Sequence, residues 1–531
     1  MPEYLAPGVY TEEIATGPVP IEGVSTSTAG MAGMTERGPA TVRLITSARE
    51  FERWYGNPVD PRVSYLPYAV QGFFDNGGRR VFVARVTRPN AAPSIVALPG
   101  GAGGGLNLEA IGDGNLDGRL FARVVEPSRR DPAQPSRPDP ARFRLQVIFY
   151  SEAPPAPLVD PFSRAQLRNP QRREPDAVED FDDLSTDPTS SSYVLTVLQN
   201  AHLVTATAPA GQPNRVDWTA FAGGADGDAV MTLDAFMGAE SPPRGVTGLA
   251  QIDEISLLCV PDEVNEALPQ AVRDGIRTAL VVQCEDLRDR FAVLQVDGKQ
   301  ADAGAINPPL TTSYAAIYYP WLRVLNPRTS DTLLVPPGGH VTGIYAGTDI
   351  ARGVHKAPAN VDIRGIVLRD LPGDRKPLEF IVNRRQQDIL NPRGINVCRD
   401  FRADRRGIRV WGARTLSADA QWKYVNVRRL FIWAEESIDE GLQWVVFEPN
   451  NEATWDRVRR SIVNFLTSVW RSGALLGTRP EEAFFVRCDR TTMSQQEIDT
   501  GQLVCYIGLA AVRPAEFVIL RYSHKTSDTV A

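Results

Sequence analysis

The chain has 531 residues, and a typical size of about 100–200 residues per domain predicts three or four domains. Its composition, 43% hydrophobic and 23% charged residues, is that of a soluble globular protein, and no stretch approaches the about 18 consecutive apolar residues of a membrane-spanning helix. The formal net charge of −7 argues against nucleic acid as the main partner, because nucleic-acid binding calls for a broadly basic domain.

Residues 1–25 are predicted to form an extended arm, without a secretory signal. A helix is disfavoured by four prolines, Pro2, Pro7, Pro18 and Pro20. Between them lies a strand-like run with too few apolar residues to bury itself, made of Val9, Tyr10, Thr11, Glu12, Glu13 and Ile14. From the residues alone, this run either pairs with the edge of another sheet or is a frayed terminus.

Residues 26–90 are predicted to be compact. The run 64–78 is typical of a helix that ends at Gly77 and Gly78, and 79–88 alternates as a strand. Residues 91–225 are predicted to be a β-rich insertion, because strand-like runs alternate there with long proline-rich loops. The glycine-rich run 99–105 lacks the Gly-Lys-Ser/Thr of a phosphate loop and is interpreted as a linker.

Residues 226–400 have an α/β pattern, in which helices alternate with continuous apolar strands, as in a parallel sheet covered on both faces. The sequence PPGG at 336–339 predicts a tight turn, followed by a helix that begins near Thr342.

The α/β region offers few groups for catalysis. Asp262 and Asp297 follow strands, where α/β active sites collect, and the nearby imidazoles are His340 and His355. There is no Gly-x-Ser-x-Gly, and Asp-Gly after a strand is also an ordinary turn. The four histidines and five cysteines are dispersed, without a CxxC pair or helical metal-ligand spacing, so we predict no metal, no cofactor and small buried thiols.

The C-terminal region is predicted as a domain over 401–512 and an arm over 513–531. It includes a strand near 443–448, a helix over 454–471 and three closing strands. One stripe of the helix is apolar, with Trp455, Val458, Ile462, Phe465, Leu466 and Val469. The opposite face carries Arg457, Arg460 and Arg471. An ordinary solvated face and a cationic contact surface for an acidic protein are both compatible with this pattern.

Motifs in this order resemble the contractile tail sheath proteins of myophages, R-type pyocins and phage-tail-like contractile injection systems. The resemblance covers both ends and most of the last 300 or so residues, and it is weaker over 91–220. Its markers are PEYLAPGVYTEE at the start, FAGGADG (221–227), TGLAQIDEISLLCVPD (247–262), YYPW (318–321), PPGGHVTGIYAGTDIARGVHKAPAN (336–360), GIRVWGARTLS (407–417), YVNVRRLFIWAEESI (424–438), FEPNNEATW (447–455) and PAEFV (514–518).

The resemblance implies an α/β fold, α+β overall, in which 91–225 is an outward-facing variable insertion and 226–400 is subtilisin-like in shape but lacks catalytic residues. It implies a structural, non-enzymatic subunit that polymerises helically, six subunits per ring, around an inner tube and contracts to drive the tube through a target envelope. The implied partners are other sheath subunits, the inner tube protein, and baseplate and tail terminator or cap proteins. Nucleic-acid binding and membrane insertion are not implied.

The resemblance also assigns roles to residues. Arg457, Arg460 and Arg471 would contact the tube. The two arms would add strands to neighbouring subunits, through residues 9–14 at the N-terminus and through Phe517, Val518, Ile519, Leu520, Arg521 and Tyr522 at the C-terminus. Assembly in the bacterial cytoplasm, in a virion tail or a tail-like particle released by lysis, is expected. The alternatives are an α/β hydrolase-like enzyme and a non-contractile tail tube or baseplate component. This second alternative predicts a β-barrel ring in place of an α/β core.

Overall fold

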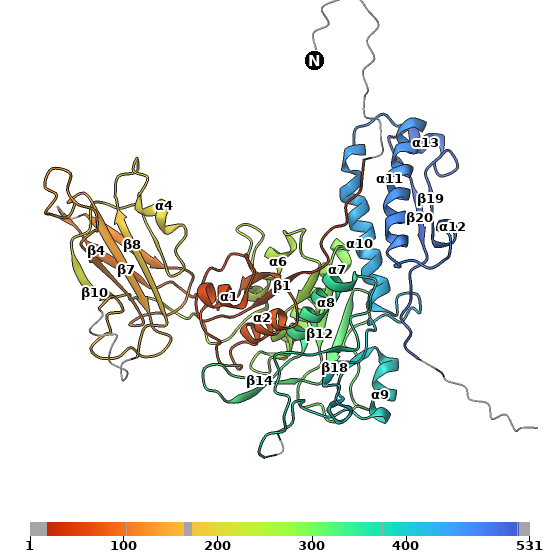
Figure 1. Cartoon of the computed structure of the whole chain (residues 1–531), viewed down its shortest axis with the longest axis horizontal. Helices are drawn as coiled ribbons and strands as arrows, with labels where there is room; N and C mark the ends of the chain where they lie inside the picture. Colours follow the sequence, from red (N-terminus) through yellow and green to blue (C-terminus); the bar gives the residue numbers. More distant parts are fainter. Residues whose placement is uncertain (1–18, 102–103, 164–172, 374, 518, 520–531) are drawn as a thin grey trace, which may run out of the picture. The chain divides into compact units, whose positions relative to one another are not determined.

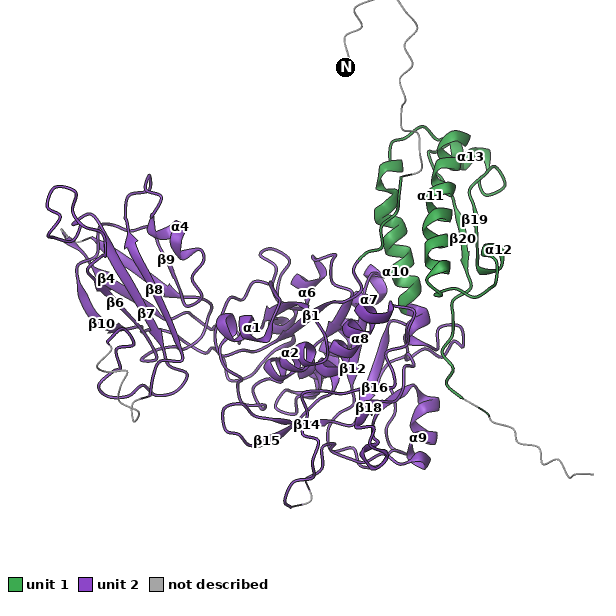
Figure 2. Ribbon diagram, in the orientation of Figure 1, with its two compact units in different colours: residues 1–24, 429–531 green, residues 25–428 purple. Residues whose placement is uncertain are grey.

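The computed structural model describes residues 19–101, 104–163, 173–373, 375–517 and 519. The chain forms two compact units, Ser25–Arg428 and a second unit that combines Met1–Val24 with Arg429–Ala531 (Figure 2). The sequence placed the start of the C-terminal domain at residue 401, whereas the first unit extends to Arg428. The reason is a strand pair, because residues on both sides of position 400 belong to one sheet.

The 25–428 unit is built on a nine-stranded mixed sheet (Figure 1). Six central strands are parallel, and antiparallel strands extend both edges. In spatial order the strands are β16 (Val361–Asp362), β18 (Ile408–Val410), β17 (Ile395–Asp400), β13 (Ala315–Tyr319), β12 (Phe291–Gln295), β11 (Leu257–Cys259), β1 (Thr28–Gly33), β3 (Arg80–Arg85) and β2 (Arg43–Ile45). The predicted α/β core is therefore confirmed, and residues 26–90 supply three of its strands.

Helices cover both faces of this sheet, which explains its continuous apolar strands. Ala292 and Leu294 of β12 share a core with α7 (Gln270–Leu287), while α6 (Gly245–Ala250) packs beside α7. The alternate residue Gln295 meets the start of α8 (Gly338–Arg352) on the other face. There α8 packs against α2 (Leu66–Asp75). Other helices of the 25–428 unit include α1 (Ala48–Tyr55), α5 (Leu233–Met237) and α9 (Arg384–Leu390).

A stripe of glycines brings α8 and α2 into very close contact. A Cβ added at Gly339 would lie 2.3 Å from the Cα of Ala69, and one at Gly343 would lie 2.4 Å from the carbonyl oxygen of Phe73. The predicted start of this helix near Thr342 is therefore wrong. The Gly-Gly pair forms the first turn of α8 and not a separate turn, because that turn has no room for side chains against α2.

The β-rich insertion is confirmed as a module of two antiparallel sheets (Figure 1). Leucine, valine and phenylalanine side chains from both sheets form one buried cluster. One sheet contains β10 (Val216–Ala220), β6 (Leu120–Val125), β7 (Phe143–Phe149) and β8 (Ala177–Leu184). The other contains β4 (Ile95–Pro99), β5 (Gly105–Ala110) and β9 (Val204–Ala206), and a short helix α4 (Val194–Leu198) precedes β9. A separate hairpin of the core joins β14 (Leu322–Leu325) and β15 (Thr332–Val335).

The C-terminal unit is a small α+β layer around a central helix, α11 (Glu452–Arg471). Phe465 of α11 packs on Trp433 of α10 (Val425–Leu442), with ring centroids 5.4 Å apart, and β19 (Phe484–Arg487) contacts the same helix. β19 pairs with β20 (Tyr506–Leu509), and two short helices, α12 (Pro480–Ala483) and α13 (Gln495–Asp499), complete the unit. The strand predicted near 443–448 is absent: a 3-10 turn at Gln443–Val445 occupies this stretch, and Phe447 is fully exposed.

The contact between α2 and α8 can be tested by filling it. We expect Gly343→Ala to lower the free energy of unfolding by about 1–3 kcal/mol, because its Cβ would overlap a backbone carbonyl of α2. Urea unfolding measures the change. Gly101→Ala is the control, since its added Cβ meets no heavy atom within 4 Å, and its stability should change by less than about 0.5 kcal/mol. Equal effects of the two substitutions would contradict the close packing.

Candidate functional site: contact surfaces of the C-terminal unit

Helix α11 is amphipathic, as the sequence predicted. Its buried residues include the whole predicted apolar stripe, Trp455, Val458, Ile462, Phe465, Leu466 and Val469. Asn451 caps the helix by accepting a hydrogen bond from the backbone N–H of Thr454 at 3.0 Å. This anchored face fixes the direction of the opposite one, so the positions of the predicted arginines follow from packing and not from their own contacts.

The arginine face of α11 carries Arg457, Arg460 and Arg471. Arg460 and Arg471 are exposed, and Arg457 is half-buried. Arg457 pairs with Glu448 at 2.8 Å, and its guanidinium lies 5.1 Å from the centre of the Trp444 ring. Asp456 pairs with both Arg459 and Arg460.

The three arginines on this face have two carboxylate partners, Glu448 and Asp456, and Asp456 is shared with Arg459, which leaves a surplus of positive charge. Exposed ion pairs of this kind contribute only about 0–1 kcal/mol, so an acidic partner can displace them. Sequence reasoning missed both carboxylates, Glu448 and Asp456. It also missed the exposed Phe447, adjacent to Glu448, which adds an apolar contact beside Arg457. The i to i+3 and i to i+4 spacing of Asp456 to the arginines was the signal for the ion pairs.

The β19–β20 pair is a second candidate surface, because its outer edges are open. Within the part of the chain that the structure describes, each of these strands pairs only with the other. Unpaired backbone N–H and C=O groups along a strand edge are a template for a further strand. Phe485 and Tyr506 add large exposed side chains to the same sheet.

The predicted arms are described only in part. All six N-terminal residues, 9–14, lie outside the described residues, as do Val518, Leu520, Arg521 and Tyr522. Phe517 and Ile519 are described, and both are largely exposed, at 71% and 76%. At the other end, the last residues of the predicted N-terminal arm are held on α10: the indole N–H of Trp433 donates to the carbonyl of Val24 at 3.1 Å, and Ile21 packs against Gly441.

The carboxyl end of the parallel sheet holds a buried polar network. Ser64 donates to Asp262 at 2.5 Å, but both residues are fully buried, so the pair is closed to a substrate. Asp297 pairs with Arg273 at 3.2 Å. Each predicted acid is thus engaged in a structural contact that joins elements of the core.

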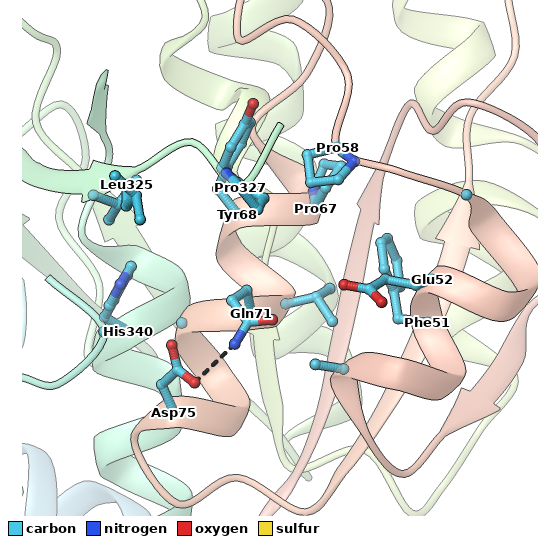
Figure 3. A pocket seen from close by; sticks show the side chains of 16 residues that line it. Phe51, Glu52, Pro58, Pro67, Tyr68, Gln71, Asp75, Leu325, Pro327 and His340 are labelled. Atoms are coloured by element: carbon cyan, nitrogen blue, oxygen red, sulfur yellow. Dashed lines mark hydrogen bonds between the residues drawn. The ribbon is translucent and has the colours of Figure 1, made fainter. Parts of the chain in front are cut away.

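A cavity of about 340 Å³ between α1, α2 and the β14 loop contains His340 (Figure 3). Burial lowers the pKa of His340 to about 4, so the imidazole is neutral. Gln71 donates to Asp75 at 2.8 Å at the edge of the cavity, and burial raises the pKa of Asp75. None of the lining residues is a serine, threonine or cysteine, so the cavity lacks the nucleophile that the hydrolase hypothesis requires.

No group of three or more histidine, cysteine, aspartate or glutamate side chains among the described residues is placed to hold a metal ion. None of the helices described is both long and apolar enough to cross a membrane.

Comparison with known proteins gives two consecutive family matches. Residues 246–416 match the phage tail sheath protein central domain, and residues 417–524 match the phage tail sheath C-terminal domain, which together cover more than half of the chain. A putative prophage major tail sheath protein of Pseudomonas aeruginosa (strain UCBPP-PA14) is 26% identical over 298 residues, covering 53% of this chain and 70% of that protein.

Solved structures match over nearly the whole chain. The helical sheath of the anti-feeding prophage in its contracted state is 25% identical, with a TM-score of 0.57, covering 98% of this chain and all of that one. The PVC sheath complex of an extracellular contractile injection system, also contracted, is 23% identical, with a TM-score of 0.58 and 99% coverage of both chains. The second likeness supports the fold alone.

The buried carboxyl of Asp262 predicts a dependence of stability on pH. Burial raises its pKa from 3.8 to about 6, so the folded state holds this proton more tightly than the unfolded state. The stabilisation from Asp262 is therefore complete below pH 4 and is lost as the pH rises to about 6. We expect the difference in unfolding free energy between wild type and Asp262→Asn to move by about 2–3 kcal/mol in favour of the variant between pH 4 and 7.

Urea unfolding of the full chain across this pH range measures that difference. The exposed Asp286→Asn substitution is the matched control and should leave the difference flat. A flat difference for Asp262→Asn as well would show that the pKa of Asp262 is the same in the folded and unfolded chains.

Proposed function

The chain belongs to the phage tail sheath family, and we propose that it polymerises helically around an inner tube and, on contraction, drives the tube through a target envelope. Like its relatives, it is a structural subunit of a contractile sheath and not an enzyme. Its nine-stranded mixed sheet also differs from the β-barrel ring that a tail tube protein would have.

The observation that carries this proposal is the two-stranded sheet with open edges in the C-terminal unit. Residues 9–14 of one neighbour and 517–522 of another would extend this sheet. Each added strand contributes a row of backbone hydrogen bonds, so subunits remain tethered while they rotate and slide. Contraction then needs no cofactor, provided that the contracted lattice buries more surface than the extended one.

The arginine face of α11 would contact the tube. Its surplus of positive charge, together with the exposed Phe447, suits an acidic protein surface with an apolar patch. The further partners proposed are five other subunits in each ring, the baseplate, and a terminator or cap protein. Assembly would take place in the bacterial cytoplasm, in a tail or tail-like particle released by lysis.

Removal of residues 1–20 tests the arm. We expect the truncated chain to remain folded, because Ile21 and Val24 keep their contacts with α10, and to form no long tubes. Negative-stain microscopy scores the tubes, and urea unfolding should show a stability within about 0.5 kcal/mol of the full chain. Deletion of residues 2–5, which leaves 9–14 in place, is the matched control. Tubes of normal length from the longer truncation would rule out the arm model.

Charge reversal tests the tube contact. The triple variant Arg457→Glu, Arg460→Glu and Arg471→Glu should bind the cognate tube protein at least about tenfold more weakly, since three exposed pairs of about 0.5 kcal/mol each are lost. Co-sedimentation with assembled tubes measures this. The control reverses three exposed arginines elsewhere, Arg62, Arg215 and Arg479. If both triple variants bind tubes like the wild type, α11 does not face the tube.

A further inference from the structure

Two of the five cysteines, Cys488 and Cys505, are neighbours across the β19–β20 ladder. The register pairs Phe484 with Leu509 and Arg487 with Tyr506, so the next positions along the two strands are Cys488 and Cys505. The two thiols influence each other, because the interaction with Cys505 lowers the pKa of Cys488 and the interaction with Cys488 raises the pKa of Cys505. Sequence reasoning treated all five cysteines as unrelated buried thiols, and Cys488 is indeed buried, but Cys505 is partly exposed.

The phase of the ladder favours a covalent bond at this position. The amide of Ala510 donates to the carbonyl of Ala483, so 483 and 510 form a hydrogen-bonded pair. Hydrogen-bonded and non-hydrogen-bonded pairs alternate along an antiparallel ladder. Counting along the register, Cys488 and Cys505 occupy a non-hydrogen-bonded position, where opposite Cα atoms are only about 4.5 Å apart and side chains are closest. This spacing falls within the range of disulfides.

We propose that Cys488 and Cys505 form a reversible cross-strand disulfide that closes when the protein meets an oxidising environment. Because this pair is not part of any cluster of three metal-ligating side chains among the described residues, a metal is not the better explanation for two adjacent thiols. The proposal does not depend on polymerisation, although the bond would join the two strands whose edges were proposed to accept the arms.

The reaction is a thiol–disulfide exchange with a low-molecular-weight disulfide such as oxidised glutathione. The interaction with Cys505 lowers the pKa of Cys488. Cys505, the partly exposed partner, gives its proton to the Cys488 thiolate and attacks one sulfur of the small disulfide. The first small thiolate leaves and takes up a proton from solvent. The Cys488 thiol then loses its proton to solvent, attacks the Cys505 sulfur and expels the second small thiolate, which also takes up a proton from solvent. Two protein thiols are oxidised and one small disulfide is reduced to two thiols.

The bond would close a loop that contains α13. Restricting this connection should stabilise the folded state of the strand pair relative to its open form. In a reducing cytoplasm the thiols would remain free, and outside the cell the bond would persist. Oxidation would thus stiffen the β19–β20 sheet after release from the cell.

The test incubates the purified full chain with oxidised glutathione, alkylates the remaining thiols and maps the peptides by mass spectrometry. We expect an intramolecular peptide link between Cys488 and Cys505 in most chains, reversed by dithiothreitol, while Cys259, Cys284 and Cys398 stay alkylatable after unfolding. Hydrogen exchange in β19 and β20 should slow by about tenfold or more on oxidation.

Two serine variants provide the controls. Cys398→Ser should still form the link, and Cys505→Ser should form none and show no change in hydrogen exchange on oxidation. The wild-type peptide map decides the question even if Cys505→Ser folds poorly. Wild-type protein in which both thiols stay free, form only glutathione adducts, or link different chains would overturn the proposal.

Discussion

The backbone groups on the outer edges of β19 and β20 are the constraint on which the C-terminal unit depends. A two-stranded sheet is marginal alone in water, and here it is supported by α11 on one face. Helix α11 is in turn fixed by its apolar stripe against α10 and the sheet. The fold thus supports strands that are well placed but incompletely paired. In the proposed polymer, strands from other subunits would pair with these edges.

The 25–428 unit, in contrast, is closely packed. The Gly339 and Gly343 stripe lets α8 approach α2 at backbone distance, and alternating core layers cover both sheet faces. Packing at this density resists deformation, because small shifts produce overlaps of backbone atoms. A subunit that must rotate as a body in a contracting lattice needs such a rigid core beside compliant connections. Rigidity in the 25–428 unit and open edges in the C-terminal unit therefore serve complementary roles in the proposed mechanism.

Much of this could be predicted from the sequence wherever periodicity decides the structure. The stripe of α11 was predicted residue by residue, because one buried face forces a 3.6-residue period. The start of α8 was missed, because Gly-Gly after Pro-Pro is typical of a turn and only the proximity of α2 makes it helical. The strand expected near Phe447 was wrong for the converse reason, since an apolar run was assumed to be buried and this side chain is fully exposed. The pairing of Cys488 with Cys505 required the strand register, which no single-strand pattern contains.

Two kinds of contact in the proposed sheath differ in strength, and the difference has a mechanical meaning. A strand added to β19 or β20 makes several backbone hydrogen bonds that must break together. The arginine face of α11 instead offers guanidinium groups of which two, those of Arg457 and Arg460, form ion pairs within their own chain, with little net energy per pair. In the proposed sheath, the weak charged contacts would separate under load before the strand pairs do. A sheath built this way would separate from its tube while its subunits stay joined. Glu448 and Asp456 would pair again with the released arginines, and this pairing would lower the barrier to separation of sheath and tube.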